Sequence, residues 1–458
     1  MKYFLFLNFA FLFISLFNQI QSQAEADLVT SIPDCEYIGT LYSGFLQVSE
    51  VKKFHYMLNY AQENPDNKPL VLWFNGGPGC SSLANWAEDH GPSKFSKDDK
   101  KLHKNEYSWI KEANMLYIES PGNVGFSKID STSADDLKIN DEITAKENLQ
   151  ALLKFYEKFP GMKTHSLYIS GVSYAGIYVP TLASEVIDYN KDKDDSVKIK
   201  LKGIFVGNGL TDPPNDDSAT YDFIFTHYLS SYEDRLEYIK YCKNEYNEEK
   251  CNKLLESILK ELEEVNMYDY LRQCDTAPKS YSFSSSNSNS YYYGNARWFF
   301  DKIKYSKNSS KLMLSIPCID STELIKYFNR KDVQEALHVS GNWDMCSDSV
   351  YNAYVQNRNG SYGVYPKLLE EKIRILIYNG DTDLVVPYNA NQMWIKKLQL
   401  AIQQPWRQWK VDGNIAGYVT KYEGLTFCTI KGTGHMATQW KPKETYYMFS
   451  RWINEQDL

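Results

Sequence analysis

The sequence predicts an α/β fold with a mostly parallel central β-sheet and helices on both of its faces. Short apolar runs rich in β-forming residues alternate, in the first half of the chain, with segments whose apolar residues have helical spacing. The same kind of run returns near the C-terminus after an interruption. Strands that alternate with helices pair mostly in parallel, and the helices then cover both faces of the sheet.

Six apolar runs are the expected strands, at residues 70–74, 114–118, 166–170, 201–206, 373–378 and 426–430. Helical spacing predicts a helix over 140–159, which stops before Pro160-Gly161, and a second helix over 178–187. The first strand leads directly into the turn Asn75-Gly76-Gly77-Pro78-Gly79.

The alternation breaks after Asp212-Pro213-Pro214. Residues 231–270 are charged, rich in tyrosine and helical in period, and residues 282–290 are almost entirely Ser and Asn, which is typical of a flexible loop. That loop is either a protease-sensitive site or a plain surface linker. The predicted division is a signal peptide at 1–24, a first core part at 25–212, an inserted helical lid at 213–315 and a second core part at 316–458.

Composition and charge exclude several classes of protein. The 458 residues contain 50 Lys+Arg and 58 Asp+Glu, a net charge of −8, which argues against a nucleic-acid-binding surface. A hydrophobic content of 43% with 15% aromatic residues argues against disorder. Lys2, the apolar run 3–17 and the small polar segment 18–26 indicate a secretory signal peptide. The alternative, a membrane anchor, is weaker because the run is shorter than a bilayer requires. We therefore expect a protein of the secretory pathway, either secreted or delivered to a lysosome or vacuole, with no membrane span once the signal is removed.

Cysteine usage agrees with an oxidising compartment. Eight cysteines behind a signal peptide favour four disulfides, and the absence of a Cys-x-x-Cys pair argues against structural zinc. Asn308 and Asn359 begin sequons for N-glycosylation, although such triplets also arise by chance.

A candidate nucleophile lies in Gly171-Val172-Ser173-Tyr174-Ala175-Gly176, between an expected strand and an expected helix. This is a variant of the Gly-x-Ser-x-Gly turn, in which small residues allow a sharp strand-to-helix bend that exposes the serine. A serine hydroxyl needs a base to accept its proton. Of the seven histidines, His435 follows the strand 426–430, at the edge where a parallel sheet places its site.

The other histidines (His55, His90, His103, His165, His227 and His338) lack that setting and are expected to be structural or exposed. An acid must orient the imidazole. Asp383 is favoured over its competitor Asp381, because it lies past the turn that follows the strand 373–378. The order Ser173, Asp383, His435 is that of the α/β-hydrolases.

Backbone N–H groups should bind the oxyanion of the tetrahedral intermediate. The residue after the nucleophile, Tyr174, supplies one of them, and Gly77 of the glycine-rich turn is the most plausible source of the other. This chemistry needs neither a cofactor nor a metal.

The chain resembles the serine carboxypeptidases, from about residue 41 to the C-terminus. The resemblance implies an α/β-hydrolase core with an inserted helical lid, and a serine-type carboxypeptidase that acts on the C-termini of peptides and proteins. It rests on Trp73-Phe74-Asn75-Gly76-Gly77-Pro78-Gly79-Cys80-Ser81-Ser82, Glu119-Ser120-Pro121-Gly122-Asn123-Val124-Gly125-Phe126-Ser127, Ser173-Tyr174-Ala175-Gly176, Gly207-Asn208-Gly209, Asp332-Val333-Gln334, Ala336-Leu337-His338, Gly380-Asp381-Thr382-Asp383 and Gly434-His435-Met436.

The same resemblance implies three disulfides: Cys80 with Cys346, Cys274 with Cys318, and Cys242 with Cys251. Parity then leaves Cys35 and Cys428, which we expect to pair with each other.

The family binds the substrate's terminal carboxylate with an asparagine of the glycine-rich turn and two carboxylic acids that share a proton. The asparagine corresponds to Asn75, and one acid to Asp89, in Asp89-His90-Gly91-Pro92. The other acid corresponds to Val172, which cannot form a hydrogen bond. Its loss should cost roughly ten- to a hundredfold in binding, unless His90 or Asn75 compensates. The alternative is that Val172 simply packs beneath the turn.

This departure leaves alternatives to strict carboxypeptidase activity. The chain could act as an esterase, an amidase or an acyltransferase, or it could be a non-catalytic protein that binds or protects a partner. The presence of Ser173, Asp383 and His435 favours an enzyme.

Overall fold

The computed structural model describes residues 24–262, 264–275 and 318–458. The predicted signal peptide, apart from Ala24, lies outside the described residues, as do the Ser/Asn segment 282–290 and the sequon at Asn308. Among the helices of the described part, none has both the length and the apolar character that a bilayer crossing requires.

One large sheet runs through the molecule in the order β1-β2-β3-β7-β4-β9-β10-β11-β14-β13-β12, with β8 paired to β3. Every neighbouring pair from β7 to β14 is parallel, and the pairs outside that stretch are antiparallel. A separate hairpin joins β5 to β6. The strands are β1 (Leu28–Val29), β2 (Leu41–Gln47), β3 (Lys52–Asn59), β4 (Leu70–Phe74), β5 (Ser93–Ser96), β6 (Lys101–Lys104), β7 (Asn114–Ile118), β8 (Lys128–Ile129), β9 (Leu167–Val172), β10 (Leu201–Gly207), β11 (Arg374–Gly380), β12 (Ile402–Val411), β13 (Asn414–Tyr422) and β14 (Leu425–Ile430).

The six predicted strands are confirmed as β4, β7, β9, β10, β11 and β14, which are the parallel strands of the sheet. The antiparallel strands β2, β3, β12 and β13 were not identified from the sequence. In β12 most side chains are exposed or half-buried, so this edge strand lacks the continuous apolar run that marks a strand buried on both faces.

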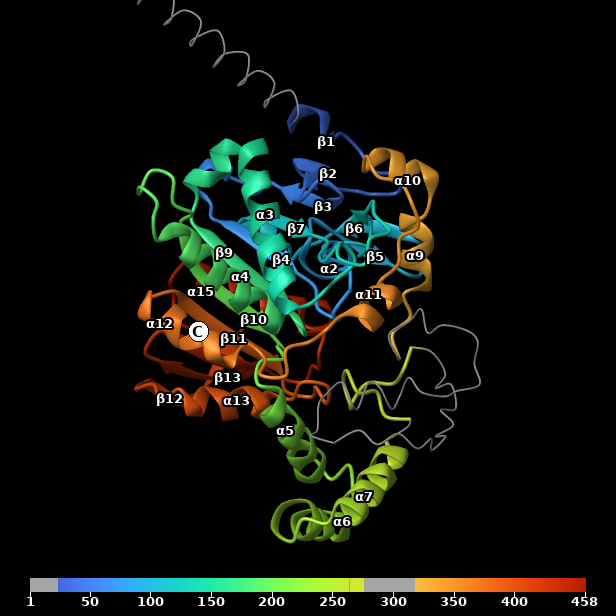
Figure 1. Cartoon of the computed structure of the whole chain (residues 1–458), viewed down its shortest axis with the longest axis vertical. Helices are drawn as coiled ribbons and strands as arrows, with labels where there is room; N and C mark the ends of the chain where they lie inside the picture. Colours follow the sequence, from blue (N-terminus) through green and yellow to red (C-terminus); the bar gives the residue numbers. More distant parts are fainter. Residues whose placement is uncertain (1–23, 263, 276–317) are drawn as a thin grey trace, which may run out of the picture.

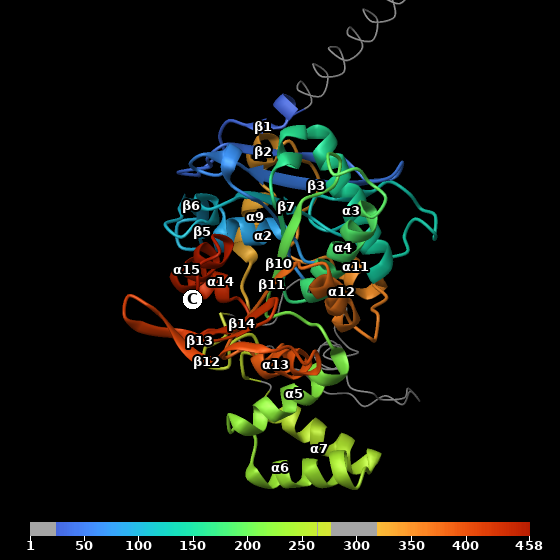
Figure 2. The same ribbon diagram turned by 90° about the vertical axis from the view of Figure 1, so that its left-hand side faces the viewer.

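Helices lie on both sides of this sheet (Figures 1 and 2). Side chains from α3, α4, α12 and α13 pack on one face, and side chains from α2, η3, α9, α10 and α15 pack on the other. The helical segments are η1 (Pro65–Asn67), α2 (Ser82–Asn85), η2 (Trp86–His90), η3 (Trp109–Lys111), α3 (Asp141–Lys158), η4 (Pro160–Thr164), α4 (Ala175–Asn190), α5 (Pro213–Thr226), α6 (Tyr232–Tyr238), η5 (Ile239–Asn244), α7 (Glu248–Glu261), α9 (Thr322–Phe328), α10 (Lys331–Ala336), α11 (Asp348–Ala353), η6 (Tyr362–Val364), α12 (Tyr365–Glu370), α13 (Tyr388–Lys397), α14 (Ala437–Trp440) and α15 (Pro442–Ile453).

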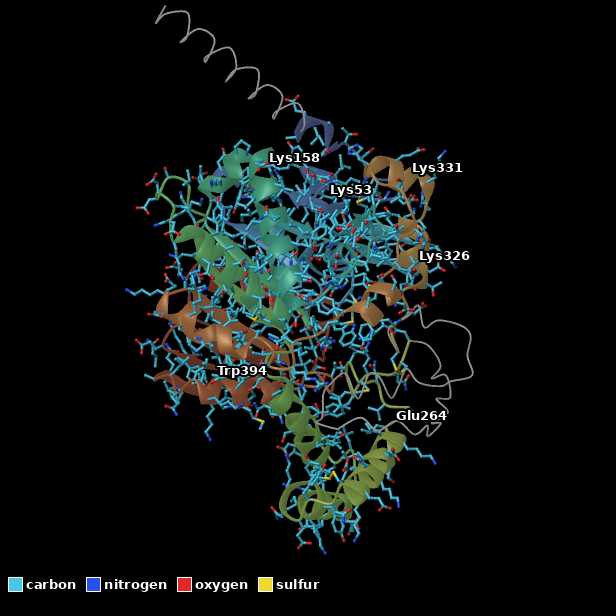
Figure 3. The ribbon with its side chains drawn as sticks, viewed as in Figure 1. Lys53, Lys158, Glu264, Lys326, Lys331 and Trp394 are labelled. Carbon is cyan, nitrogen blue, oxygen red and sulfur yellow. A yellow bond between two sulfur atoms is a disulfide. The ribbon has the colours of Figure 1, made fainter. Side chains whose placement is uncertain are left out.

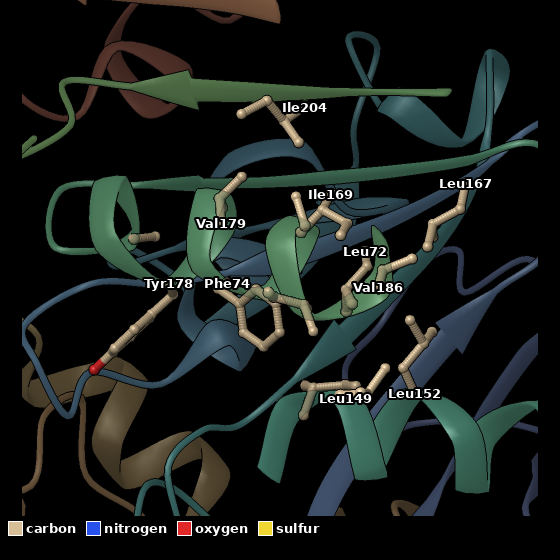
Figure 4. Packing of buried hydrophobic residues seen from close by; sticks show 14 of the residues in the cluster. Leu72, Phe74, Leu149, Leu152, Leu167, Ile169, Tyr178, Val179, Val186 and Ile204 are labelled. Atoms are coloured by element: carbon tan, nitrogen blue, oxygen red, sulfur yellow. The ribbon is translucent and has the colours of Figure 1, made fainter. Parts of the chain in front are cut away.

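The apolar runs of the parallel strands supply both cores at once. In β4, Leu70, Leu72 and Phe74 face the core under α3 and α4, whereas Val71 and Trp73 face the opposite core. Alternate side chains of a strand point to opposite faces, so a strand covered on both sides must be apolar at every position. Figure 4 shows Leu72, Phe74 and Ile169 against α3 and α4.

Helix α3 illustrates how the local sequence sets an element's start and end. The Asn140 side chain accepts a hydrogen bond from the backbone N–H of Ile143 at 2.8 Å, which caps the first turn. The helix ends at Lys158, just before Pro160. The helix predicted over 140–159 is therefore confirmed almost to the residue.

The helices α5, α6 and α7 project away from the sheet (Figure 1). They form a small apolar core of their own, in which Phe223, Ile224, Leu254 and Ile258 are buried. A disulfide between Cys242 and Cys251 joins η5 to α7.

On another part of the surface, the charged side chains of Lys326 and Lys331 reach outward from α9 and α10 (Figure 3).

Two further disulfides join Cys80 to Cys346 and Cys274 to Cys318, the pairs that the resemblance implies. The expected fourth disulfide is wrong, because Cys35 and Cys428 are both free. Cys428 is buried on β14 with its Sγ 3.5 Å from Met448 Sδ, whereas Cys35 lies in an N-terminal segment bridged to Leu102 of β6. Parity of the cysteine count carries no information about which elements the fold brings together.

Candidate active site

Ser173 directly follows β9 and has a left-handed backbone conformation, with φ of 64°. Its N–H donates to Gly207 O at 3.0 Å, which fixes the bend against β10. The bend needs its small neighbours: a Cβ at Gly171 would lie 2.5 Å from Ala175 Cβ, and one at Gly176 would lie 2.3 Å from Leu210 O. Strain of this kind is characteristic of a nucleophile held at a sharp strand-to-helix turn.

His435 and Asp383 form a close pair. His435 Nδ1 lies 2.7 Å from Asp383 Oδ2, and both side chains are buried. Asp381, the competing acid, does not contact the imidazole; its Oδ1 accepts a hydrogen bond from Gly432 N–H instead. The geometry therefore favours Asp383 as the partner of His435.

Asn208 is a functional candidate whose role sequence reasoning missed. Its Nδ2 donates to Asp383 Oδ2 at 2.7 Å, and the N–H groups of Val385 and Val386 donate to Asp383 Oδ1 at 2.8 and 3.3 Å. These bonds compensate the carboxylate for lost water and fix its orientation. The available signal was the position of Asn208, a polar residue two positions after the predicted strand 201–206.

The strand order explains why these residues converge. Ser173, Asn208, Asp383 and His435 follow β9, β10, β11 and β14, which are neighbours in the parallel part of the sheet. Parallel strands place their carboxyl ends at one edge, so residues far apart in sequence meet there.

The glycine-rich turn after β4 lies against the Ser173 bend. A Cβ at Gly76 would be 2.5 Å from Tyr174 N and 2.7 Å from Ser173 Cβ, so only glycine allows this approach. Gly77 has φ of 113° and begins a tight turn in which Cys80 N–H donates to Gly76 O at 3.0 Å. The main chain of this turn therefore packs directly against Ser173 and Tyr174.

Two buried carboxylates anchor this turn and the bend. Glu119 accepts hydrogen bonds from Ser81 Oγ, from Trp343 Nε1 at 3.2 Å and from Phe126 N–H at 2.8 Å. Asp141 accepts the hydroxyl of Tyr174 at 2.8 Å, which ties the residue after Ser173 to the start of α3. Neither role was identified from the sequence.

The residues expected to bind a substrate carboxylate lie on the segment that follows β4. The Asn75 side chain bonds within the turn, with Nδ2 donating to Ser81 O at 2.9 Å and Oδ1 accepting from Gly76 N–H at 2.9 Å. Asp89 is buried, and its Oδ2 accepts from Asn85 Nδ2 and Thr438 Oγ1, both at 2.7 Å. Thr438 lies three residues after His435, so Asp89 is close to the loop that carries the base.

Burial dominates the protonation of this segment. It raises the pKa of Asp89 above its ordinary value, and it raises the pKa of the neighbouring Glu88 to about 8. The charged form of a carboxyl is costly where water is excluded, and the adjacent Asp89 charge adds to the effect on Glu88. Glu88 was not singled out from the sequence.

His90 and Val172 are both core residues. The His90 ring stacks on Trp109 with centroids 4.3 Å apart, its Nδ1 lies 2.9 Å from Tyr117 Oη, and burial lowers its pKa to about 3. His90 is therefore held in the core, and its compensation for Val172 stays a prediction. Val172 is 9% exposed and packs in the core beneath the bend, which agrees with the alternative that the sequence left open.

The Ser173 bend, the His435–Asp383 pair and the glycine-rich turn lie on loops that follow neighbouring parallel strands, and this arrangement is suited to acyl transfer. Among the described residues, no cluster of three His, Cys, Asp or Glu side chains could hold a metal ion.

Comparisons with known proteins identify the family. The serine carboxypeptidase family model matches residues 34–455. The chain is 36% identical to serine carboxypeptidase-like 31 of Arabidopsis thaliana, over 94% of this chain and 89% of the relative, and 33% identical to serine carboxypeptidase 24 of the same plant, over 100% and 98%.

A solved structure shows the same fold. The crystal structure of Kex1(delta)p, a prohormone-processing carboxypeptidase from Saccharomyces cerevisiae, superposes with a TM-score of 0.74 over 94% of this chain and 96% of that chain, at 21% identity. The core is an α/β-hydrolase fold, as expected. The chain belongs to the serine carboxypeptidase family.

Proposed function

We propose that this protein is a serine-type carboxypeptidase that removes C-terminal residues from peptides through an acyl-enzyme. Family membership supports the reaction class. The observation that carries the assignment to particular residues is the His435–Asp383 hydrogen bond of 2.7 Å, at the sheet edge where Ser173 has its strained conformation.

In the proposed reaction His435 Nε2 takes the proton of Ser173 Oγ while Oγ bonds to the scissile carbonyl carbon. The N–H groups of Tyr174 and Gly77 stabilise the oxyanion. The C–N bond then breaks as His435 returns the proton to the leaving amine. Water repeats the sequence and releases the shortened peptide. Asp383 keeps the imidazole oriented and stabilises its positive charge.

Asp89 is the proposed ligand of the substrate carboxylate, together with Asn75. Both of the hydrogen bonds that Asp89 accepts from side chains end on Oδ2. A proton on Oδ1, favoured by the raised pKa, would let Asp89 donate to the substrate anion. This interaction weakens as the pH rises and Asp89 ionises.

The alternatives receive less support. Esterase, amidase or acyltransferase activity was suggested by Val172, but the curated relatives described above are serine carboxypeptidases or named for their likeness to them. A non-catalytic binding protein would have no need for an oriented imidazole–carboxylate pair at the same sheet edge as a strained serine.

We further propose a route through the secretory pathway, on the strength of the charged start and apolar run at residues 2–17. Asn359 is exposed and is the proposed glycosylation site within the described residues. Asn308 remains a second candidate from its sequon alone.

The test compares a blocked dipeptide with a free C-terminus against its C-terminal amide, between pH 4 and 8, with Ser173→Ala as the control. We expect the free acid to be cleaved faster, most clearly at low pH, and the Ser173→Ala variant to lose roughly 10⁴-fold or more in kcat. Preference for the amide at every pH would contradict the carboxylate-binding assignment. Equal rates for wild type and Ser173→Ala would exclude the proposed nucleophile.

A further inference from the structure

The segment 266–270, which follows α7 within the helical insertion, contacts both loops that carry the acid and the base. Leu384 N–H donates to Met267 O at 3.0 Å, and His435 N–H donates to Tyr268 O at 2.6 Å. Tyr270 N–H returns a bond to Thr382 O at 3.2 Å. Both loops are therefore hydrogen-bonded to the same short backbone segment of the insertion.

A buried side chain reinforces these main-chain bonds. Asp269 is 6% exposed, and its Oδ1 accepts the Thr382 hydroxyl at 2.6 Å and Leu271 N–H at 3.2 Å. Thr382 directly precedes Asp383. The Leu384 side chain, on the other side of Asp383, is buried in the apolar core of the insertion.

Close packing leaves this contact little freedom. A Cβ at Gly434 would lie 1.8 Å from Tyr268 O, and a Cβ at Gly380 would lie 2.0 Å from Gly434 O. Thr382 N–H also donates to Thr433 O at 3.0 Å, so the two loops are bonded to each other as well as to the segment. A small displacement of the segment must therefore move both loops.

We propose that the segment 266–270 positions the acid–base pair, with Asp269 as a positioning residue that acts through Thr382 on Asp383. This rests on the proposed function, since it concerns the same Ser173, His435 and Asp383. General-base catalysis requires the reacting groups to be held to within about half an ångström. The insertion supplies that constraint through its contacts with the Thr382 and His435 loops.

The chain offers matched variants for the test. Thr382→Val removes the hydroxyl that bonds to Asp269. Thr433→Val removes an equally buried hydroxyl that has no partner among the described residues. Asp269→Asn keeps the Oδ1 acceptor, and Asp269→Ala removes it.

Two rates are measured for each variant: kcat and KM on the blocked dipeptide, and the rate at which a fluorophosphonate labels Ser173. In labelling, Ser173 Oγ bonds to phosphorus, fluoride leaves and His435 accepts the proton, so the rate reports the acid–base pair without requiring peptide binding. We expect Asp269→Ala and Thr382→Val to lower both kcat and the labelling rate by roughly 10- to 100-fold, with little change in KM. Asp269→Asn and Thr433→Val should stay within about threefold of wild type.

The proposal is overturned if Thr382→Val and Asp269→Ala keep both rates near wild type, or if Thr433→Val loses as much as Thr382→Val. Thr382→Val alone decides the matter if Asp269→Ala does not fold. A wild-type protein that is labelled at Ser173 but cleaves no peptide would contradict carboxypeptidase activity, and its labelling rates would still test the segment. A wild type that is not labelled at all would overturn the positioning proposal, because there would be no active pair to position.

Discussion

The loops that follow β10, β11 and β14 differ from the segment that follows β4 in how their buried polar groups are satisfied. On the first side, Asp383 accepts bonds from His435, from Asn208 and from two backbone N–H groups. On the second side, Glu88, Asp89 and His90 are buried with few partners, and the pKa of each is shifted by burial.

The difference separates catalysis from pH response. A carboxylate held by four donors has one orientation, which is what a base-orienting acid requires. Carboxyls that are buried with little compensation keep their protons to higher pH, which is what recognition of an anionic substrate requires. The following predictions test that separation, from the largest expected effect to the smallest.

Asp383→Asn should lower kcat/KM by roughly 10⁴-fold, because the amide stabilises the wrong tautomer of His435 and cannot support its charge. Asp381→Asn, two residues away, should change the same constant by less than about tenfold, since Asp381 contacts the Gly432 backbone and not the imidazole. Steady-state kinetics on the blocked dipeptide measure both. Equal losses would mean that the two acids have not been distinguished correctly.

Asn208→Gly should lower kcat by roughly 10- to 100-fold, because it removes the amide that donates to Asp383 Oδ2. Asn208 has φ of 45°, so glycine keeps the backbone conformation that other residues would strain. Asn114→Ala is the control: this buried amide bonds to Pro65 O and Lys68 O at the opposite end of the sheet. Asn114→Ala should lower the melting temperature without changing kcat. An unchanged kcat in Asn208→Gly, or an equal loss of kcat in Asn114→Ala, would contradict the role of Asn208.

Val172→Glu should restore a second carboxyl beside the nucleophile and lower KM for the free acid by roughly tenfold at pH 4.5. The C-terminal amide should show no such gain. The shared proton donates a hydrogen bond that is strong when the acceptor is a charged carboxylate, and the amide carries no charge. Val172→Leu, which keeps an apolar side chain in the same core, should leave the ratio of the two substrates unchanged. A gain for acid and amide alike would point to a general change in the site.

Glu88→Gln should flatten the pH dependence of stability. The pKa of Glu88 is about 8 in the folded protein and about 4.5 in the unfolded chain, so between these values the folded state holds a proton that the unfolded state has lost. The free energy of unfolding therefore falls as the pH rises from about 4.5 to 8, and the Gln variant removes that contribution, on the order of 3 kcal/mol.

Urea unfolding at pH 5 and pH 8 measures this difference. Burial raises the pKa of Asp216 to about 7, so Asp216 contributes in the same sense as Glu88. The Glu88→Gln variant therefore keeps part of the fall in the free energy of unfolding with pH. His90 acts in the opposite sense below about pH 6.5, because its folded pKa of about 3 makes the unfolded state the one that binds a proton. An unchanged slope in Glu88→Gln would mean that Glu88 is ionised in the folded protein at neutral pH.

Sequence patterns predicted the parallel strands and the chemistry-bearing residues for related reasons. A strand covered on both faces must be apolar at every position, so 70–74 and 114–118 were recognisable as short runs. Ser173, Asp383 and His435 were recognisable because each lies just after such a run. The edge strand β12 and its neighbour β13 carry no comparable signal, since buried and exposed positions are mixed along both and neither forms a continuous apolar run.

The sequence by itself determined the parallel strands at the centre of the sheet, the residues at the ends of those strands and the family. Only the tertiary structure decided that Cys35 and Cys428 stay apart, that Asn208 holds Asp383, that His90 lies in the core and that residues 266–270 reach the His435 loop. The last three outcomes depend on partners between roughly 20 and 175 residues away along the chain. The periodicity of a segment indicates its secondary structure and which of its side chains are buried. A contact between distant segments is instead fixed by how all the strands and helices pack together.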